Sequence, residues 1–345
     1  MNKTIFKYIF RIQLKTMLLV SAAVFFLILL FDFAEVGRKY PLSTLSETLF
    51  TIKLSLLRAP STFCETAGYV YFITAAFTLW NLCRSHQVTV LKSVGRSPQQ
   101  ILYPFLSFAA LVAGVWLFLM HPAGLFLESM YARSVFGVAA EANRNIWIDD
   151  RENDQMIFIK SICDNKIDGL CVFNLKNGSR IFAEQAYAEK KIWFLKNVTT
   201  TDENKTQNIE TAEIPRRVSP RLIKLLAKSP KKHNIYGLYK IYKIRKKDRV
   251  SVRLYELELH RLLANGFAFF LFALLAAVIC FPINRYKTKT DVAIKAIASA
   301  VFLRFANNMF ESFAYGDVLP VQLASWAPSL IFACVAMALL IRREA

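Results

Sequence analysis

Long uninterrupted apolar runs are the feature of this chain that most constrains its fold. A helix needs roughly 20 mostly apolar residues to cross a bilayer core of about 30 Å. Six stretches meet or approach that length, at about residues 17–36, 62–83, 101–120, 262–282, 292–313 and 321–341. The second and fifth contain charged residues and rest partly on the even number of spans that they produce. The sequence therefore predicts a helical membrane protein with six transmembrane helices.

The chain is also strongly basic. Its 44 Lys and Arg residues oppose 25 Asp and Glu, which gives a net charge of +19. Apolar residues make up 55% of the chain, which excludes a disordered protein. Their long runs also disfavour a compact nucleic-acid-binding protein, so we expect no nucleic-acid partner. A membrane protein with basic flanks explains both features.

The distribution of Lys and Arg over the short loops predicts the orientation of the chain. With six spans, four basic segments fall on one side: the N-terminus, the loops after the second and fourth spans, and the C-terminus. We interpret that side as the cytoplasm. The long segment between the third and fourth spans then lies outside. Its own excess of base does not upset this topology, because long segments translocate largely regardless of charge.

That long outer segment changes character after Asn145. Short β-type runs alternate with turn residues, and Asn177-Gly178 between two such runs is a strong hairpin signal. This pattern predicts an antiparallel sandwich or partial barrel. The predicted organisation is transmembrane helices one to three in residues 1–143, the β domain in 144–218, a helical connector in 219–261, and transmembrane helices four to six in 262–345.

Two cysteines in the β domain leave two interpretations open. Cys163 and Cys171 flank the turn at residues 164–169. In an oxidising outer compartment they would form a hairpin disulfide. The alternative is two free thiols at apolar strand positions, because sequence spacing alone does not fix the cross-strand register.

Motifs for catalysis or cofactor binding are absent from the sequence. It has no phosphate-binding loop, no dinucleotide fingerprint, no H-E-x-x-H and no G-x-S-x-G. The 4 histidines are scattered without the spacing of metal ligands. We therefore expect no catalytic residue, no metal site and no cofactor in this chain. If its activity consumes ATP, a separate chain must bind the ATP and Mg²⁺.

Charged residues inside the predicted spans are the first candidate functional residues. Asp32, Glu65 and Arg304 qualify, and such groups usually face a bundle interior or a cavity. We hypothesise that Arg304 faces a cavity near Asp32 or Glu65, pairing with an acid at rest and with a lipid phosphate during transport. The alternative is a purely structural ion pair. Arg38 and Lys39, at the outer end of the first span, are candidates for contact with an anionic lipid, or else ordinary interfacial anchors.

The short segment between the second and third spans is the second candidate. Its apolar residues precede a glycine, and Ser97-Pro98 then starts a new helix as N-cap and first turn. A short interfacial helix of this kind suits docking into a groove on a cytoplasmic partner. A membrane-surface helix without a partner fits the same pattern. The candidate docking residues, within about 85–97, are Gln87, Val88, Val90, Leu91, Val94, Gly95 and Arg96.

With these features in place, the chain resembles the permease subunits of the bacterial lipopolysaccharide exporter, the LptF/LptG family, and LptG more than LptF. The matching features follow the family order: Arg38-Lys39 at the end of span one, Val88–Gly95 as the coupling helix, Asn145-Ile146-Trp147 at the start of the outer domain, and the tail at residues 319–330. One position departs from the family pattern. Gln87 stands where a glutamate is usual, which puts the family's salt bridge to the ATPase in doubt.

The resemblance implies an ATP-binding-cassette transporter in which this chain pairs with a second permease of the family around a central cavity. A dimeric cytoplasmic ATPase would dock on the coupling helices. The outer domain, expected to be a β-jelly roll, would work with a single-span periplasmic jelly-roll bridge protein. The implied function is to extract lipopolysaccharide from the outer leaflet of the inner membrane and pass it to that bridge. Two alternatives stay open: a permease of another lipid or lipoprotein cassette transporter, and a membrane sensor with an outer β domain.

Overall fold

The computed structural model of the chain separates into two compact units. The first, here called the helical unit, is Met1–Tyr131 with His260–Ala345, and the second, the sheet unit, is Ala132–Leu259. The residues described are 3–39, 44–136, 146–150, 154–163, 166–189, 192–202, 205–215, 220–226, 228–248, 253–281 and 289–342.

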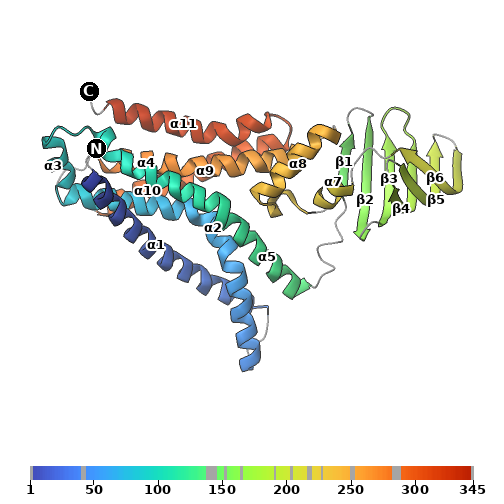
Figure 1. Ribbon diagram of the computed structural model, residues 1–345, viewed down its shortest axis with the longest axis horizontal. Coiled ribbons are helices and arrows are strands. Elements are labelled where there is room, and N and C mark those ends of the chain that lie inside the picture. Colours follow the sequence, from blue (N-terminus) through green and yellow to red (C-terminus); the bar gives the residue numbers. More distant parts are fainter. Residues whose placement is uncertain are drawn as a thin grey trace. The chain divides into compact units, whose positions relative to one another are not determined.

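Long helices make up the helical unit (Figure 1). They are α1 (Lys3–Gly37), α2 (Leu45–Arg84), α3 (Gln87–Ser93), α4 (Pro98–Val115), the π-helical turn η1 (Trp116–Met120), α5 (His121–Phe136), α9 (Arg253–Cys280), α10 (Lys289–Tyr315) and α11 (Val321–Arg342). The last residues of α5 and the first of α9 belong to the sheet unit.

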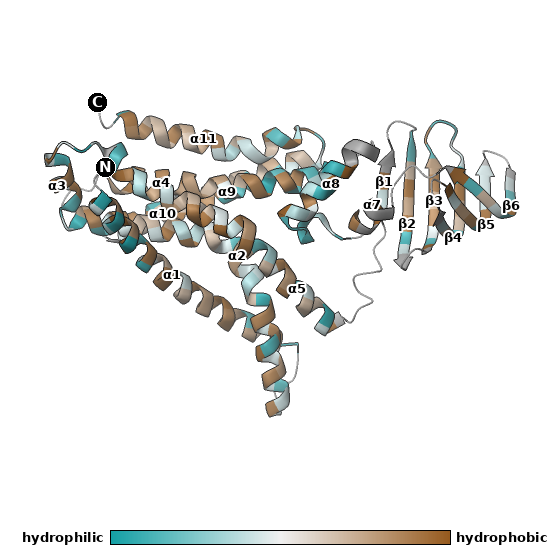
Figure 2. Ribbon diagram, in the orientation of Figure 1, coloured by the Kyte–Doolittle hydropathy of each residue, from teal (hydrophilic) through white to brown (hydrophobic). Residues whose placement is uncertain are grey.

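Four stretches in the described residues are long and apolar enough to cross a membrane, namely Lys3–Gly37, Gln99–Val135, Arg253–Cys280 and Val321–Arg342. They contain the first, third and sixth predicted spans and residues 262–280 of the fourth. The apolar middle of α1 and its polar first turns are visible in Figure 2. The second and fifth predicted spans fall in α2 and α10, which have 40 and 27 residues and carry internal charges. Membrane crossing by these two helices stays a prediction.

The helices α1 and α2 form an antiparallel hairpin. Near one end of it, Gln13 donates a hydrogen bond from Nε2 to the Tyr71 hydroxyl at 3.4 Å. Further along, the Phe25 and Phe63 rings meet edge to face with centroids 5.7 Å apart. The first turns of α2 extend past the end of α1 (Figure 1). Because α2 contains Pro60, which cannot donate a backbone hydrogen bond, the helix has a physical reason to bend there.

The third predicted span continues as one helical run from α4 through η1 into α5. The π turn at Trp116–Met120 immediately precedes His121, whose N–H bonds to the Trp116 carbonyl. Pro122 follows, and because it has no N–H to donate, the regular α-helical pattern is interrupted at this point. The predicted helical extension after residue 120 is confirmed as far as Phe136. The rest of it lies outside the described residues.

The sheet unit contains one antiparallel sheet. Its strands are β1 (Ile146–Asp150), β2 (Gln155–Cys163), β3 (Lys166–Asn174), β4 (Arg180–Glu189), β5 (Ile192–Asp202) and β6 (Lys205–Pro215). Each strand pairs with the next, in the order β1 to β6. The predicted hairpin at Asn177-Gly178 is confirmed, because β3 and β4 pair antiparallel on either side of it and Gly178 adopts a φ of +63°. The order is a meander, without the Greek-key crossovers of the expected jelly roll among these strands.

Helices, not a second sheet, cover one face of this sheet in the described residues. They are α7 (Pro220–Leu226) and α8 (Ile235–Asp248), with the short 3₁₀ turn η2 (Pro230–Lys232) between them. Leu222, Ile223, Leu226 and Ile241 pack with sheet residues such as Ile159 in one buried cluster. The expected sandwich is therefore not confirmed in the described residues. The residues predicted to be a connector supply the apolar layer that a second sheet would have supplied.

The register of β2 and β3 keeps the two cysteines of this unit apart. The residue opposite Cys163 is Lys166, whereas the residue opposite Cys171 is Phe158. Cys171 has a free thiol. The two Cα atoms are thus separated by five positions along the strands, about 16 Å, which exceeds the reach of a disulfide. This geometry supports the interpretation of unbonded thiols.

Candidate functional site

A cluster of four charges lies where the C-terminal end of α1 meets α2. The Arg58 guanidinium of α2 lies 2.9 Å from a Glu35 carboxylate oxygen, measured from Nη1, and 3.8 Å from Asp32 Oδ1, measured from Nε. Lys39 Nζ is 3.4 Å from the same Glu35 oxygen. Asp32 and Glu35 are three residues apart on α1 and so share a helix face. We call these four residues the hairpin charge cluster.

Burial divides the hairpin charge cluster into an inner and an outer part. The Asp32 side chain is 8% exposed, and that of Lys39 is 61% exposed. Asp32 Oδ2 is buried and has no hydrogen-bond partner among the described residues. Asp32 thus depends mainly on the charge of Arg58, since a buried carboxylate without a partner is costly.

The partner of Asp32 differs from the sequence hypothesis, which placed Arg304 near either Asp32 or Glu65. Asp32 faces Arg58, while Arg304 of α10 lies close to the Tyr69 side chain of α2. Glu65 precedes Tyr69 by one helical turn, and both Glu65 and Arg304 are exposed on the helical unit. The structure therefore brings Arg304 to the part of α2 that carries Glu65.

Sequence reasoning did not assign Arg58 or Glu35 to the site. A signal for Arg58 existed, because the first outer loop is unexpectedly basic for that side of the membrane. A signal for Glu35 existed too, since it follows Asp32 by three residues and precedes Lys39 by four, which is helical spacing. Arg38 and Lys39 are both exposed, and they follow directly after the last residue of α1.

The candidate docking segment contains the short helix α3. Gly95 ends it with a φ of +78°, where the Gly95 N–H bonds to the Lys92 carbonyl and the next N–H, of Arg96, bonds back to Leu91. This is a C-terminal cap that favours glycine. The predicted N-cap of α4 is confirmed, because Ser97 Oγ accepts a hydrogen bond from the Gln100 N–H at 3.3 Å.

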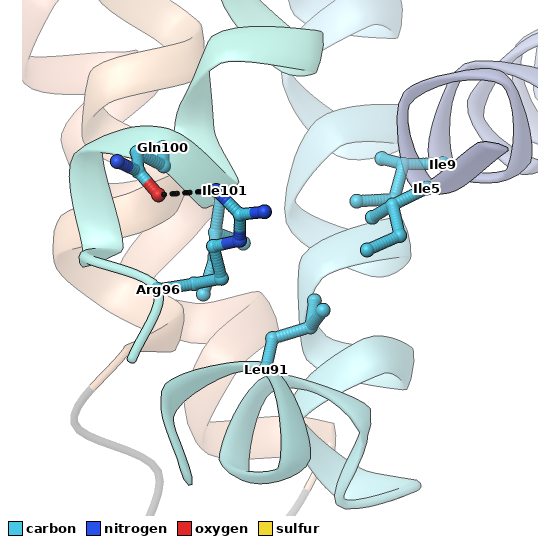
Figure 3. A pocket seen from close by; sticks show the side chains of 6 residues that line it. All are labelled: Ile5, Ile9, Leu91, Arg96, Gln100 and Ile101. Carbon is cyan, nitrogen blue, oxygen red and sulfur yellow. Dashed lines mark hydrogen bonds between the residues drawn. The ribbon is translucent and has the colours of Figure 1, made fainter. Parts of the chain in front are cut away.

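The apolar residues of this segment do not form the single surface that the sequence predicted. Val88 is buried, and Leu91 points into a small pocket between α3, α4 and the start of α1 (Figure 3). Val90 and Val94 are 59% and 73% exposed. The physical reason is helical spacing, since positions three or four apart share a face. Of these apolar residues, Val90 and Val94 are therefore the two that are open to a partner.

The pocket beside α3 joins it to the first helix of the chain. Figure 3 shows Leu91 on one side and Ile5 and Ile9 of α1 on the other. Arg96 and Gln100 close the pocket, with Arg96 Nη1 donating to Gln100 Oε1 at 3.3 Å. This lining is mostly aliphatic, so the pocket is a packing contact between α3 and α1.

The described residues contain no group of three or more His, Cys, Asp or Glu side chains that could hold a metal ion. Comparison with known protein families matches residues 7–342 to the model of the lipopolysaccharide export system permease LptF/LptG. That match covers nearly the whole chain. None of the curated proteins compared with the chain matches it significantly.

Proposed function

Because the chain belongs to the lipopolysaccharide export system permease LptF/LptG family, we propose that it is one permease subunit of an ATP-driven lipopolysaccharide transporter. The family consists of transporter permeases of the inner membrane and not of enzymes. The chain would take lipopolysaccharide from the outer leaflet of that membrane and pass it to a periplasmic bridge protein. The match over residues 7–342 is the observation that carries this proposal.

We propose that the chain crosses the membrane six times, with α2 and α10 as the second and fifth spans and the sheet unit in the periplasm. The exposed charges of Glu65 and Arg304 support a partner on this side of the helical unit. Charged side chains inside a bilayer avoid lipid and face a cavity or another protein. A second permease of the family would cover these residues and form a central cavity with them, and the LptG type is our preferred assignment for this chain.

Lipid binding is assigned to the basic residues near the outer membrane boundary. Arg38 and Lys39 would contact lipopolysaccharide phosphates first, because both are exposed at the end of α1. Arg304 would bind a phosphate deeper in the cavity, where its planar guanidinium can bind two oxygens at once. Asp32 and Glu65 would then act as the carboxylates that balance the bases when no lipid is bound. Asp32 does this through Arg58, at 3.8 Å.

Coupling to ATP hydrolysis is assigned to α3. Val90 and Val94 would enter a groove on a dimeric cytoplasmic ATPase, which binds the ATP and Mg²⁺. Both residues are exposed in the isolated chain, which supports this role. Gln87, at the start of α3, would make a neutral hydrogen bond where the family's glutamate forms a salt bridge.

Co-purification from native membranes tests this function. A tagged copy of the chain should bring down a cassette ATPase and a second six-span permease, and lipopolysaccharide should stimulate ATP hydrolysis by the assembly. Stimulation by a lipoprotein or another lipid, and not by lipopolysaccharide, would favour the alternative cassette transporter. Isolation of the chain without any ATPase would contradict the proposal and favour a membrane sensor.

A further inference from the structure

The helix α8 has one face packed on the β-sheet of its own unit and one face exposed. Leu238 and Ile241 are almost completely buried, and Ile241 belongs to the hydrophobic cluster that joins the helices to the sheet. On the opposite side Tyr236, Tyr239 and Tyr242 are 57%, 61% and 45% exposed. The helix is therefore amphipathic in an unusual way, because its exposed face carries aromatic residues.

Lysines accompany these tyrosines. Lys240 and Lys243 are exposed, and each follows a tyrosine directly in sequence. Over residues 235–248 the sequence has five bases and one acid. Tyrosine and lysine both combine an apolar body with a polar tip, which suits the headgroup region of a bilayer. A helix with such a face lies in the membrane surface, where anionic lipids attract its bases.

The same hydrophobic cluster fixes the first turn of α9, which leads into a candidate membrane helix. The Tyr255 hydroxyl lies 2.9 Å from the Leu226 and Lys228 carbonyl oxygens, and its ring packs against the cluster. From Arg253 the helix runs unbroken to Cys280. The predicted span begins at Leu262, seven residues after Tyr255, so this anchor lies about 10 Å along the helix from the start of the span. Four residues separate the end of α8 from the start of α9.

From these observations we propose that the tyrosine–lysine face of α8 docks on the anionic headgroups of the bilayer that the chain spans. The buried side of α8 ties this contact to the sheet. The sheet unit is then held at the membrane surface by α8 as well as by its covalent links to the spans. This role is independent of the cargo, so it stands whichever lipid the chain transports.

Photo-cross-linking in the full-length chain tests the proposal. The chain, in complex with whatever subunits it requires, is placed in nanodiscs of zwitterionic phospholipid with or without anionic phospholipid. Tyr239 is replaced by p-benzoyl-phenylalanine, and the control carries the same residue at Leu175, which is 61% exposed in the β3–β4 turn. We expect phospholipid adducts at position 239, several-fold more frequent with anionic lipid, and none at position 175.

Charge reversal supplies the matched control. The pair Lys240→Glu and Lys243→Glu should reduce phospholipid adducts at position 239 several-fold. The pair Lys231→Glu and Lys232→Glu changes the charge equally at two exposed residues of η2 and should leave the adducts unchanged. All four lysines are exposed, so none of these changes disturbs the core. Adducts to a protein chain in place of lipid, or lipid adducts that do not depend on anionic lipid, would overturn the proposal.

Discussion

Opposite charges where the C-terminal end of α1 meets α2 are matched residue by residue. Arg58 serves two carboxylates, Asp32 and Glu35, and Lys39 serves the more exposed of them. The energetic importance of these pairs differs because their exposure differs. An exposed ion pair contributes between zero and about 1 kcal/mol, whereas removing one partner of a buried pair costs about 3–5 kcal/mol.

Removing Arg58 should therefore destabilise the hairpin more than removing Lys39. We expect Arg58→Met to cost about 2 kcal/mol, between the two limits, because Arg58 is 30% exposed while Asp32 is 8% exposed. Thermal unfolding of the purified chain in detergent measures this. Lys39→Met is the matched control and should change the midpoint little. Adding Asp32→Asn to Arg58→Met should restore part of the loss, and a further loss would contradict this account of Asp32.

His233 makes the stability of the sheet unit depend on pH. Burial lowers its pKa below the ordinary value, although its hydrogen bond to the Leu225 carbonyl, at 2.9 Å from Nε2, acts in the other direction. The unfolded chain then binds a proton more readily than the folded chain. The neutral histidine stabilises the fold fully above about pH 6.5, and this stability is lost as the pH falls below that value.

We predict that the thermal unfolding midpoint decreases when the pH is lowered from about 7.5 to about 5.5. His233→Gln should make this decrease smaller. Glutamine keeps a hydrogen-bond donor but does not titrate. The exposed His86 provides the control, because His86→Gln should leave the pH dependence as it is in the native chain. An equal pH dependence in the native chain and in His233→Gln would rule out His233 as its source.

At the scale of elements, α3 illustrates what sequence reasoning could and could not reach. The sequence predicted a short helix, the break at Gly95 and the N-cap at Ser97, because each has a local chemical signature. It did not separate the inward pair from the outward pair. The spacing of Val90 and Val94 could have done so in part, but which pair turns inward depends on where Ile9 and the rest of α1 lie.

The sheet unit shows the same division. Turn residues such as Asn177-Gly178 indicate hairpins, so the antiparallel strands could be predicted from the sequence. The covering layer was not, because α7 and α8 resemble a connector until the apolar face of the sheet is known to need them. The register of Cys163 and Cys171 was also out of reach, since one bulge shifts the pairing of a strand.

The two faces of α3 should respond differently to substitution. Val90→Asp with Val94→Asp places two charges on the apolar docking surface and should reduce the ATPase that co-purifies with the chain about tenfold. That factor corresponds to a loss of about 1.4 kcal/mol of binding free energy. The unfolding midpoint should stay constant, since both residues are exposed. Leu91→Ala should do the reverse by enlarging the pocket beside Ile5 and Ile9, and lower the midpoint. Loss of the ATPase in both variants with equal unfolding would mean that α3 does not have these two roles.

At the scale of the whole molecule, apolar and charged side chains are both exposed on the helical unit, as expected of one subunit of a larger membrane complex. Large apolar side chains such as Phe31 of α1 and Phe305 of α10 are widely exposed. On α10 an exposed arginine, Arg304, stands directly beside Phe305. Lipid suits the apolar side chains but not the charge, which supports the second permease proposed above for this surface. Part of the net charge of +19 belongs to the bases that are proposed above to contact an anionic lipid.

Arg304 offers the sharpest test of that path, because transport and structure predict different patterns of variants. If it binds lipid phosphate, Arg304→Ala should lower lipopolysaccharide-stimulated ATPase activity of the assembly about tenfold, while Arg304→Lys should keep part of it, since lysine binds phosphate as a point charge. Tyr69→Phe removes the hydroxyl that lies close to Arg304 and should leave the stimulation largely intact. If the arginine only supports α2, Tyr69→Phe should reproduce Arg304→Ala in unfolding experiments and in stimulation alike. Unchanged stimulation in both Arg304 variants would end the transport role and leave Arg304 as a structural contact between α2 and α10.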